Sequence, residues 1–312
     1  MGVSSIDKVY DNIKSVRIQG ATNVAIAVAE AMKRYIETTK EVSPKIIGEQ
    51  VLQIGNLLAN ARQNEPLARN LVEYVEIQSK KFDGETVGDY SSYVSGVLDD
   101  FMGMLKQAKR SMIDHGTELL HDKNTILTHC HSSSTENILK GLFILNKNLK
   151  IIATETRPLY QGRITTTNLI KAGLDVSMVV DDAVASLLIL GQYGDVDALL
   201  IGCDEMSYKG DIINKVGSLS MALAAKEAGK PIYVTTTLLK TNLQWDGTSN
   251  GKVIEQRSSV EVWEDAPNGL NIINPAFDIV PNRYITGYIT EAGLLSANEL
   301  KSRLHTVYNW LM

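Results

Sequence analysis

A thiol, two imidazoles and three hydroxyls follow one another at residues 129–134, in the order His-Cys-His-Ser-Ser-Ser. The residues before them, Thr125–Thr128, are β-branched or apolar and predict a short buried strand. Ser133 and Glu136 stand three residues apart ahead of an apolar run, a capping-box pattern that predicts the start of a helix. Ligands of open α/β sheets bind beyond the carboxyl ends of the strands, and helix amino ends attract anions. The stretch therefore predicts a site that binds phosphate and performs chemistry.

Further polar clusters follow other strand-like runs in the second half of the chain. One is Glu155–Arg163, which contains two arginines and a tyrosine. Another begins with Cys203-Asp204-Glu205 and continues through Lys209–Gly217, and a weaker one is Thr235–Thr237 with Lys240 beyond it. Because the carboxyl ends of parallel strands meet at one edge of a sheet, we expect these clusters to lie near the thiol-bearing stretch.

An alternation of strands and helices must position these clusters. Five strand-like runs are present: Thr125–Thr128, Lys150–Thr154, Val176–Val180, Ala198–Gly202 and Ile232–Thr236. Helical patterns lie around Thr135–Leu145, Thr166–Ala172, Ala183–Leu190 and Asn214–Ala228. Such alternation predicts right-handed crossovers and a mainly parallel sheet. Residues 243–283 look rich in loops, and one or two strands are expected after them.

The first 120 residues show helical spacing and almost no strand pattern. Apolar residues recur at three- and four-residue intervals over Gly20–Tyr35, and a long helix is expected around Val94–Met112. Pro44, after Ser43, and Pro66 are each expected to open a helix. The predicted fold is α/β, with an all-helical domain at residues 1–120 and a Rossmann-like domain at residues 121–312.

Composition excludes several classes of protein. The formal net charge of −5 gives no electrostatic reason to expect a nucleic-acid partner. No apolar run approaches the roughly 18 residues that a membrane-spanning helix needs. The two cysteines, Cys130 and Cys203, are too few for a disulfide framework and favour a reducing compartment, so we expect a cytoplasmic protein.

Each polar residue also has an ordinary structural interpretation. Cys130 is a small residue of the kind often buried at a strand end, and it also has Cys203 as a conceivable redox partner. His129 and His131 suggest a metal, but neighbouring strand residues point to opposite faces and no further ligands have zinc spacing. We therefore expect no metal and no cofactor.

The charged residues of the later clusters have structural roles open to them as well. Arg157 and Arg163 are suited either to tying loops or subunits together or to contacting substrate. Asp211 is placed to cap the helix that follows it, and Lys240 taken alone is an ordinary solvated lysine.

Three motifs resemble those of one protein family. They are Thr-Arg-Pro-Leu-Tyr-Gln-Gly-Arg at 156–163, Gly-Asp-Ile-Ile-Asn-Lys-Val-Gly at 210–217 and Ile-Thr-Glu-Ala-Gly at 289–293. The family contains the alpha, beta and delta regulatory subunits of translation initiation factor two-B and two sugar-phosphate isomerases. These isomerases act on methylthioribose 1-phosphate and, in archaea, on ribose 1,5-bisphosphate. The resemblance covers nearly the whole chain and implies a helical domain followed by a Rossmann-like domain.

The resemblance implies a reaction as well. Cys130 and Asp204 stand where the isomerases have a cysteine and an aspartate, and the serine-rich turn and Tyr160 look closest to the ribose 1,5-bisphosphate branch. Because a sugar phosphorylated at C1 cannot open to a free aldehyde, one group must move the C2 proton and another must serve the oxygens. Cys130, as a thiolate favoured by the adjoining helix amino end, is suited to move the proton on C2. Asp204 is suited to act as acid and then base on the sugar oxygens. Lys215 would steady a phosphoenolate intermediate.

The resemblance also implies contacts to two phosphates. The candidate phosphate contacts are Gln19, Gly20, Ala21, Thr22, Arg62, Ser132, Ser133, Ser134, Asn214, Lys215 and Lys240. Near the amino end the isomerases have a sequence similar to Arg-Gly-Ala-Gly-Arg, whereas this chain has Gln-Gly-Ala-Thr-Asn at 19–23. Loss of a charge-assisted hydrogen bond to a phosphate costs about 1.5–3 kcal/mol of binding free energy, so this difference in sequence affects which substrate is expected. His131 is a smaller departure, at a position where the family suggests asparagine.

Three functions are therefore compatible with the sequence. The first is isomerisation of ribose 1,5-bisphosphate to ribulose 1,5-bisphosphate in the salvage of nucleoside monophosphates. The second is a non-catalytic regulatory subunit that senses a nucleotide or sugar phosphate, and the third is isomerisation of methylthioribose 1-phosphate. The family implies a homo-oligomer, either a dimer or a hexamer, with a nucleoside monophosphate as a possible allosteric ligand.

Overall fold

The structure, a computed structural model, describes residues 3–191 and 194–311. Within these ranges it divides into two compact units. The first comprises residues 3–107, 239–241 and 304–311, and the second comprises residues 108–238 and 242–303. The boundary expected between residues 120 and 121 stays a prediction of where the domains separate.

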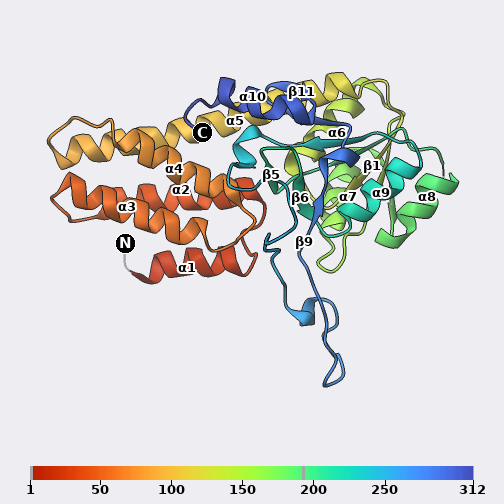
Figure 1. The fold of residues 1–312 in the computed structure, drawn as a ribbon, viewed down its shortest axis with the longest axis horizontal. Helices are drawn as coiled ribbons and strands as arrows, with labels where there is room; N and C mark the ends of the chain where they lie inside the picture. Colours follow the sequence, from red (N-terminus) through yellow and green to blue (C-terminus); the bar gives the residue numbers. More distant parts are fainter. Residues whose placement is uncertain (1–2, 192–193, 312) are drawn as a thin grey trace. The chain divides into compact units, whose positions relative to one another are not determined.

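Helices make up the first unit, as the apolar spacing predicts (Figure 1). They are α1 (Val3–Lys14), α2 (Ala21–Thr38), α3 (Pro44–Ala59), α4 (Pro66–Ser79) and the first part of α5 (Val87–Leu119). Pro44 and Pro66 open their helices as predicted, and Ser43 caps α3 by accepting a hydrogen bond from the Ile46 amide at 3.5 Å. The helix α1 is a feature that the spacing from Gly20 onward does not predict. Among the described residues, no helix combines the length and the apolar character needed to cross a membrane.

The main sheet of the second unit has seven strands in the order β11-β10-β7-β4-β1-β2-β3, all parallel except β11. Their bounds are β1 (Thr125–His129), β2 (Lys150–Thr154), β3 (Asp175–Val179), β4 (Ala198–Ile201), β7 (Ile232–Thr235), β10 (Gly287–Thr290) and β11 (Gly293–Leu295). The five predicted strands match the first five of these to within one residue at either end. The prediction of an α/β fold with a mainly parallel sheet is confirmed.

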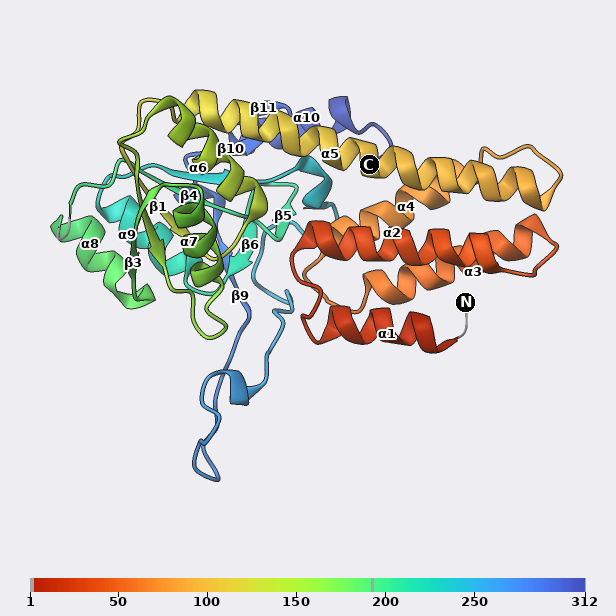
Figure 2. The same cartoon turned by 180° about the vertical axis from the view of Figure 1, so that it is seen from behind.

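Helices alternate with these strands along the chain (Figure 2). They are α6 (Ser133–Leu145), α7 (Gln161–Lys171), the short η1 (Asp181–Ala183) with α8 (Val184–Leu190), α9 (Ser218–Glu227) and, near the end, α10 (Ala297–Val307). Apolar residues of α6 and α7, such as Leu139 and Leu169, form one fully buried cluster with Ile126, Ile151 and Leu200 from the central strands. This burial stabilises the sheet and orients its carboxyl ends.

A second, antiparallel sheet contradicts part of the predicted helix Asn214–Ala228. Strand β6 (Ile212–Lys215) pairs with β5 (Glu205–Ser207) and β9 (Phe277–Val280), so Asn214 and Lys215 belong to a strand. The pairing of β6 with β9 joins segments about 60 residues apart, which local spacing cannot reveal, whereas β5 lies only a few residues before β6. The strand β9 likewise lies inside the stretch predicted to be loops, while the two-residue strand β8 (Thr241–Asn242) precedes that stretch and η3 (Ser259–Glu261) interrupts it.

Gly162 allows α7 to begin directly against the end of β2. A β-carbon built on Gly162 would overlap the carbonyl oxygen of Thr154, which is backbone and has no rotamer with which to move away. Any larger residue at this position must push the helix from the strand, and the polar loop between them would move with it.

We predict that Gly162→Ala lowers the free energy of unfolding by about 1–3 kcal/mol, because overpacking against backbone displaces the helix. The matched control is Gly103→Ala in α5, where a β-carbon meets nothing within 4 Å and the backbone is helical. That control should stabilise by about 0.5–1 kcal/mol. Urea denaturation followed by circular dichroism measures both changes. Equal effects of the two substitutions would contradict the steric account.

Candidate active site

The register of three neighbouring strands brings the predicted catalytic residues to one sheet edge. Strand β1 lies between β2 and β4, and its last residue, His129, pairs with Ile201 of β4. The residue after His129 is Cys130, and the Asp204 amide, a few residues beyond Ile201, donates to the Ile213 carbonyl of β6 at 2.9 Å. The Cys130 thiol thereby lies within electrostatic range of the Asp204 carboxylate and of Lys215.

Close packing around Gly202 connects this edge to α6. A β-carbon on Gly202 would lie 2.9 Å from Cβ of Ser132 and 3.9 Å from Oδ1 of Asn214. The absence of a side chain at Gly202 therefore lets the amino end of α6 approach the ends of β4 and β6. Two predicted polar residues, Ser132 and Asn214, consequently lie close to Gly202, and Lys215 follows Asn214 on β6.

The cap of α6 lies one residue earlier than the capping-box pattern predicts. Ser132, not Ser133, is the N-cap, and its hydroxyl accepts a hydrogen bond from the Thr135 amide at 3.4 Å. Glu136 does not reach back to the cap, because its carboxylate accepts from Lys140 at 2.5 Å and from Asn168 at 2.9 Å. The cap thus begins directly after the His-Cys-His run.

The backbone of Cys130 is held in an uncommon conformation. Its φ of 65° lies in the left-handed region, which residues with a β-carbon rarely adopt. Its amide donates to Thr156 Oγ1 at 2.9 Å, and its carbonyl accepts from Thr165 Oγ1 at 2.9 Å. Thr156, whose hydroxyl accepts from the Cys130 amide, and Tyr160 in the same turn also have positive φ values, of 64° and 57°. Strain of this kind clusters at functional sites.

The expected thiolate is not the resting form of Cys130. Burial raises the pKa of the thiol to about 11, and the carboxylates of Asp204 and Asp181 act in the same direction. The Lys215 ammonium opposes them and is the main influence that lowers the pKa. Loss of solvation therefore outweighs the favourable charges in the resting protein, and the thiolate expected for the reaction stays a prediction. A neutral thiol faces a cation and a carboxylate.

His129 is a buried, neutral structural residue. Burial lowers its pKa to about 4. Its Nε2 lies 2.9 Å from the Val216 carbonyl, which only accepts, so Nε2 carries the proton and donates. Its Nδ1 then accepts from Thr154 Oγ1 at 2.6 Å. Both ring nitrogens are therefore engaged, and the imidazole links β1 and β2 to the loop that follows Lys215.

Among the described residues, no observation supports a metal site at His129 and His131 or a redox pair of Cys130 and Cys203. Within residues 3–191 and 194–311, no three His, Cys, Asp or Glu side chains are grouped so that they could hold a metal ion. Cys130 and Cys203 are not joined by a disulfide, and the Cys203 thiol donates to the Glu205 carbonyl at 3.1 Å.

The two arginines of the second cluster tie loops together. Arg157 donates to the Tyr160 hydroxyl and, at 2.9 Å, to the Val262 carbonyl. Arg163 forms an ion pair with Glu155 at 3.2 Å and lies 3.7 Å from the centroid of the Tyr160 ring. The structural interpretation of both arginines thus has direct support, and they brace the turn that carries Thr156.

The expected cap of α9 is supplied by a different aspartate. Asp278 on β9 accepts from the Gly217 and Leu219 amides at 2.8 and 3.0 Å. Asp211 instead accepts from Ser207 Oγ at 3.2 Å and from the Asn282 amide at 3.1 Å. A negatively charged side chain therefore already occupies the amino end of α9, which disfavours a phosphate there.

Three buried polar groups of the second unit were not named as ligand contacts from the sequence, although Gln161 and Thr235 lie in the predicted polar clusters. Gln161, buried at the start of α7, has an amide oxygen that lacks a hydrogen-bond partner in the described structure, and so do the hydroxyls of Thr135 in α6 and Thr235 at the end of β7. Buried polar atoms in folded proteins are rarely left unsatisfied, so these three are candidate contacts for a bound ligand. Gln161 lies within the quoted motif Thr-Arg-Pro-Leu-Tyr-Gln-Gly-Arg, which was the available signal.

The remaining predicted contacts of the second unit lie at the amino end of α6. Ser133 is exposed, and its hydroxyl accepts from Lys109 at 3.1 Å. Asn214 is buried and donates to Ser218 Oγ at 2.8 Å, while Lys215 lies 4.9 Å from the centroid of the Phe277 ring. Ser134 is partly buried in the first turn of α6. Their contact with a phosphate stays a prediction.

The first unit holds the other predicted contacts. Gln19 and Gly20 precede α2, and Ala21 and Thr22 open it; Gly20 is the N-cap, with a φ of 85°, and no described side chain caps this end. Arg62 is buried and forms an ion pair with Glu65 at 2.7 Å, so a carboxylate already balances its charge. Lys240 ends η2 (Leu238–Lys240). Their convergence with Cys130 also stays a prediction.

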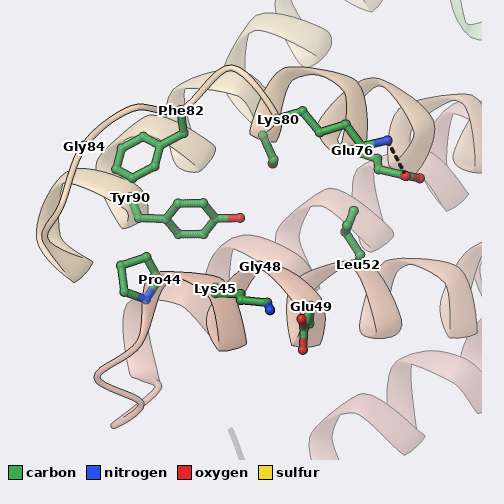
Figure 3. Close-up of a pocket in the computed structure, with 11 residues that line it drawn as sticks. Pro44, Lys45, Gly48, Glu49, Leu52, Glu76, Lys80, Phe82, Gly84 and Tyr90 are labelled. Carbon is green, nitrogen blue, oxygen red and sulfur yellow. Dashed lines mark hydrogen bonds and ion pairs between the residues drawn. The ribbon is translucent and has the colours of Figure 1, made fainter.

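A separate cavity of about 360 Å³ lies among α3, α4 and the start of α5 in the first unit (Figure 3). The ring of Tyr90 crosses it and packs edge-on against Phe82, with ring centroids 5.1 Å apart. Lys80 and Glu76 on its rim form an ion pair at 2.9 Å. The cavity contains none of the predicted catalytic or phosphate-binding residues.

Comparisons with known proteins agree with the quoted motifs. The model of the Initiation factor 2 subunit family matches residues 17–297. The ribose 1,5-bisphosphate isomerase of Methanocaldococcus jannaschii is 30% identical over 98% of this chain and 96% of its own. The 5-deoxyribose 1-phosphate isomerase of Petrotoga mobilis is 32% identical over 93% of this chain and 86% of its own. The crystal structure of 5-methylthioribose 1-phosphate isomerase from Pyrococcus horikoshii OT3 superposes with a TM-score of 0.79 at 25% identity, covering 97% and 88% of the two chains.

We predict that Lys215→Met slows alkylation of Cys130 by iodoacetamide about tenfold at pH 8. Removing the ammonium raises the thiol pKa further, and one unit of pKa changes the thiolate fraction tenfold. In the unaltered protein the alkylation rate should climb with pH up to about 11, since the thiolate fraction grows until pH reaches the pKa.

Mass spectrometry of the peptide that contains Cys130 measures this rate separately from that of Cys203. The exposed Lys226→Met on α9 is the matched control and should leave the rate unchanged. A rate that is independent of Lys215, or flat with pH, would contradict the electrostatic description.

Proposed function

Because the chain belongs to the initiation factor 2 subunit family, we propose that it is an isomerase of a ribose phosphorylated at C1. The proposed substrate is ribose 1,5-bisphosphate and the product is ribulose 1,5-bisphosphate. The observation that carries the proposal is the Cys130 thiol at the same strand ends as the Asp204 carboxylate and the Lys215 ammonium. A regulatory subunit needs no such set of groups.

The first step removes a proton from C2 and opens the ring. Cys130, deprotonated in the closed complex with Lys215 as its counter-charge, accepts the proton from C2. The bond between C1 and the ring oxygen breaks as Asp204, which has taken up the proton that left the Cys130 thiol, gives that proton to the ring oxygen. The electron pair of the C2–H bond becomes the C1–C2 double bond of an enol that still carries the C1 phosphate. No cofactor is required, because the electrons stay within the sugar.

The second step completes the transfer. Asp204, now a carboxylate, removes the proton of the C2 hydroxyl, and charge develops on O2. Lys215 and nearby backbone amides stabilise that charge. The thiol of Cys130 returns its proton to C1, which leaves a ketone at C2 and a CH₂ group bearing the phosphate at C1. The proton lost from C2 has moved to C1, and both protein groups regain their starting forms.

In this proposal the phosphates are bound by groups at helix amino ends, by lysines and by one arginine. In the second unit these are Ser132–Ser134 at the start of α6, with Lys109 beside them. In the first unit the uncapped amino end of α2 offers the amides of Gly20–Thr22, and Arg62 and Lys240 complete the proposed set. We further infer a cytoplasmic homo-oligomer that acts in the salvage of nucleoside monophosphates.

A second candidate substrate is 5-deoxyribose 1-phosphate. The sequence Gln-Gly-Ala-Thr-Asn at 19–23 lacks the two arginines of the isomerase pattern, which removes cations suited to a phosphate. The Petrotoga mobilis relative, named for this substrate, has as high an identity as the bisphosphate isomerases. The chemistry at C1 and C2 would be unchanged.

We predict that the purified protein converts ribose 1,5-bisphosphate to a ketose with a kcat/KM at least about tenfold above that for 5-deoxyribose 1-phosphate, since phosphate contacts at C5 add binding energy. Carbon-13 spectroscopy of the sugar at C2 follows both reactions. The reverse preference would support the second candidate. Binding of ribose 1,5-bisphosphate without conversion would support a sensing subunit and reject the isomerase.

We predict that Cys130→Ala and Asp204→Asn each lower kcat at least about 1000-fold while the substrate still binds, because each removes one proton-transfer group. Isothermal titration calorimetry measures binding and the ketose assay measures turnover. Cys203→Ala is the matched control for the thiol and should keep its activity, since Cys203 is buried against Glu205. Turnover near the unaltered rate in either active-site variant would reject its assigned role.

A further inference from the structure

We propose that Thr156 is a positioning residue whose hydroxyl holds the Cys130 amide and so keeps the thiol-bearing residue in its left-handed backbone conformation. The catalytic consequence of this role rests on the isomerase reaction proposed above. The hydrogen bonds themselves do not depend on which substrate the protein takes.

The conformation of Cys130 requires support from outside its own strand. Its φ of 65° is unfavourable for a residue with a β-carbon, and such a conformation persists only where surrounding groups enforce it. Two side-chain hydroxyls do so, since Thr156 accepts from the Cys130 amide and Thr165 donates to the Cys130 carbonyl, each at 2.9 Å. Both peptide groups of the thiol residue are thus fixed by side chains, and a side-chain substitution can release either.

Thr156 is itself fixed more firmly than an ordinary loop residue. It is fully buried, its amide donates to Asp181 Oδ1 at 2.9 Å, and its carbonyl accepts from the Tyr160 amide at 2.7 Å. The neighbouring Arg157 amide donates to Asp181 Oδ2 at 2.7 Å. Asp181 lies just beyond β3, so a carboxylate from the edge strand holds the turn after β2, and that turn holds Cys130 after β1.

The same hydroxyl connects the thiol residue to the loop after Lys215. His129 Nε2 donates to Val216, so its Nδ1 accepts the Thr154 hydroxyl proton at 2.6 Å. Thr154 Oγ1 is then left to accept, and Thr156 Oγ1, which lies 3.3 Å from it and 3.5 Å from His129 Nδ1, is the donor. One directed series of hydrogen bonds therefore runs from the Cys130 amide through Thr156, Thr154 and His129 to the Val216 carbonyl. Loss of the Thr156 hydroxyl breaks this series where it meets the thiol residue.

Two substitutions of Thr156 separate the hydroxyl from the shape of the side chain. Thr156→Val keeps the branched shape and removes the hydroxyl, whereas Thr156→Ser keeps the hydroxyl. Hydrogen–deuterium exchange with fragmentation measures the exchange rate of the Cys130 amide hydrogen directly and needs no substrate. We expect exchange at least about tenfold faster in Thr156→Val and near the unaltered rate in Thr156→Ser.

Steady-state kinetics then read the consequence for turnover. In Thr156→Val we expect kcat to fall at least about tenfold with KM changed less than about threefold, because the thiol is misplaced while the phosphate contacts remain. Thr156→Ser should restore most of kcat. The matched control is Thr167→Val on the exposed face of α7, where the hydroxyl only bonds back to the Arg163 carbonyl, and it should change neither measurement.

The outcomes distinguish this role from the proposed reaction. Unchanged exchange of the Cys130 amide in Thr156→Val overturns the proposal, as does faster exchange with an unchanged kcat. An unaltered protein that makes no ketose rejects the isomerase, yet the exchange measurement still decides whether Thr156 holds the amide. If Thr156→Val does not fold, Asp181→Asn replaces it, since it removes one acceptor from the turn, and it too must speed the exchange.

Discussion

The register of β1 between β2 and β4 is the constraint on which this site depends. The strand hydrogen bonds end at His129, so the peptide groups of Cys130 must find partners elsewhere, and they find them in the hydroxyls of Thr156 and Thr165. A slip of one residue in this register would exchange the side chains that β1 presents to the two buried faces of the sheet and would place a different residue at the edge. The apolar contacts that fix the register therefore also fix where the thiol stands.

Burial and charge act in opposite directions at this edge. Removal from water raises the pKa of Cys130 to about 11, while the Lys215 ammonium lowers it and the carboxylates of Asp204 and Asp181 raise it. His129 contributes no charge, because burial lowers its pKa to about 4 and both nitrogens are used in hydrogen bonds. A proton leaves the thiol readily only when a cation is held close to it. The position of Lys215 on β6, next to the loop that His129 binds, therefore affects how readily the Cys130 thiol ionises.

Local patterns were sufficient for five strands of the main sheet, and long-range pairing explains much of what they missed. The short apolar runs predict β1 to β4 and β7 to within one residue, and proline after serine predicts the start of α3, because these signals lie within a few residues. Asn214 and Lys215 were predicted in a helix, since nothing local reveals that β6 pairs with β9. The capping pattern named Ser133 where the cap is Ser132, and the role of Asp278 at α9 depends on a contact about 60 residues away. The thiol and the carboxylate stand in polar clusters that the sequence places at strand ends, and their catalytic roles came from the family resemblance. The hydrogen bonds from hydroxyls to the peptide groups of Cys130 follow only from the fold.

The choice of substrate depends on groups other than the proposed catalytic pair. Ribose 1,5-bisphosphate and 5-deoxyribose 1-phosphate are identical at C1 and C2, so a thiol and a carboxylate acting there cannot distinguish them. Discrimination must come from the groups that meet C5, and the candidates are the uncapped amides of Gly20–Thr22 with Arg62 and Lys240. Backbone amides bind a phosphate through partial charges, which is weaker than binding by the two arginines of the isomerase pattern. Arg62 is moreover already balanced by Glu65. The same fold and the same chemistry can therefore serve either sugar, and the proposal that residues 19–23 contact a phosphate stays a prediction.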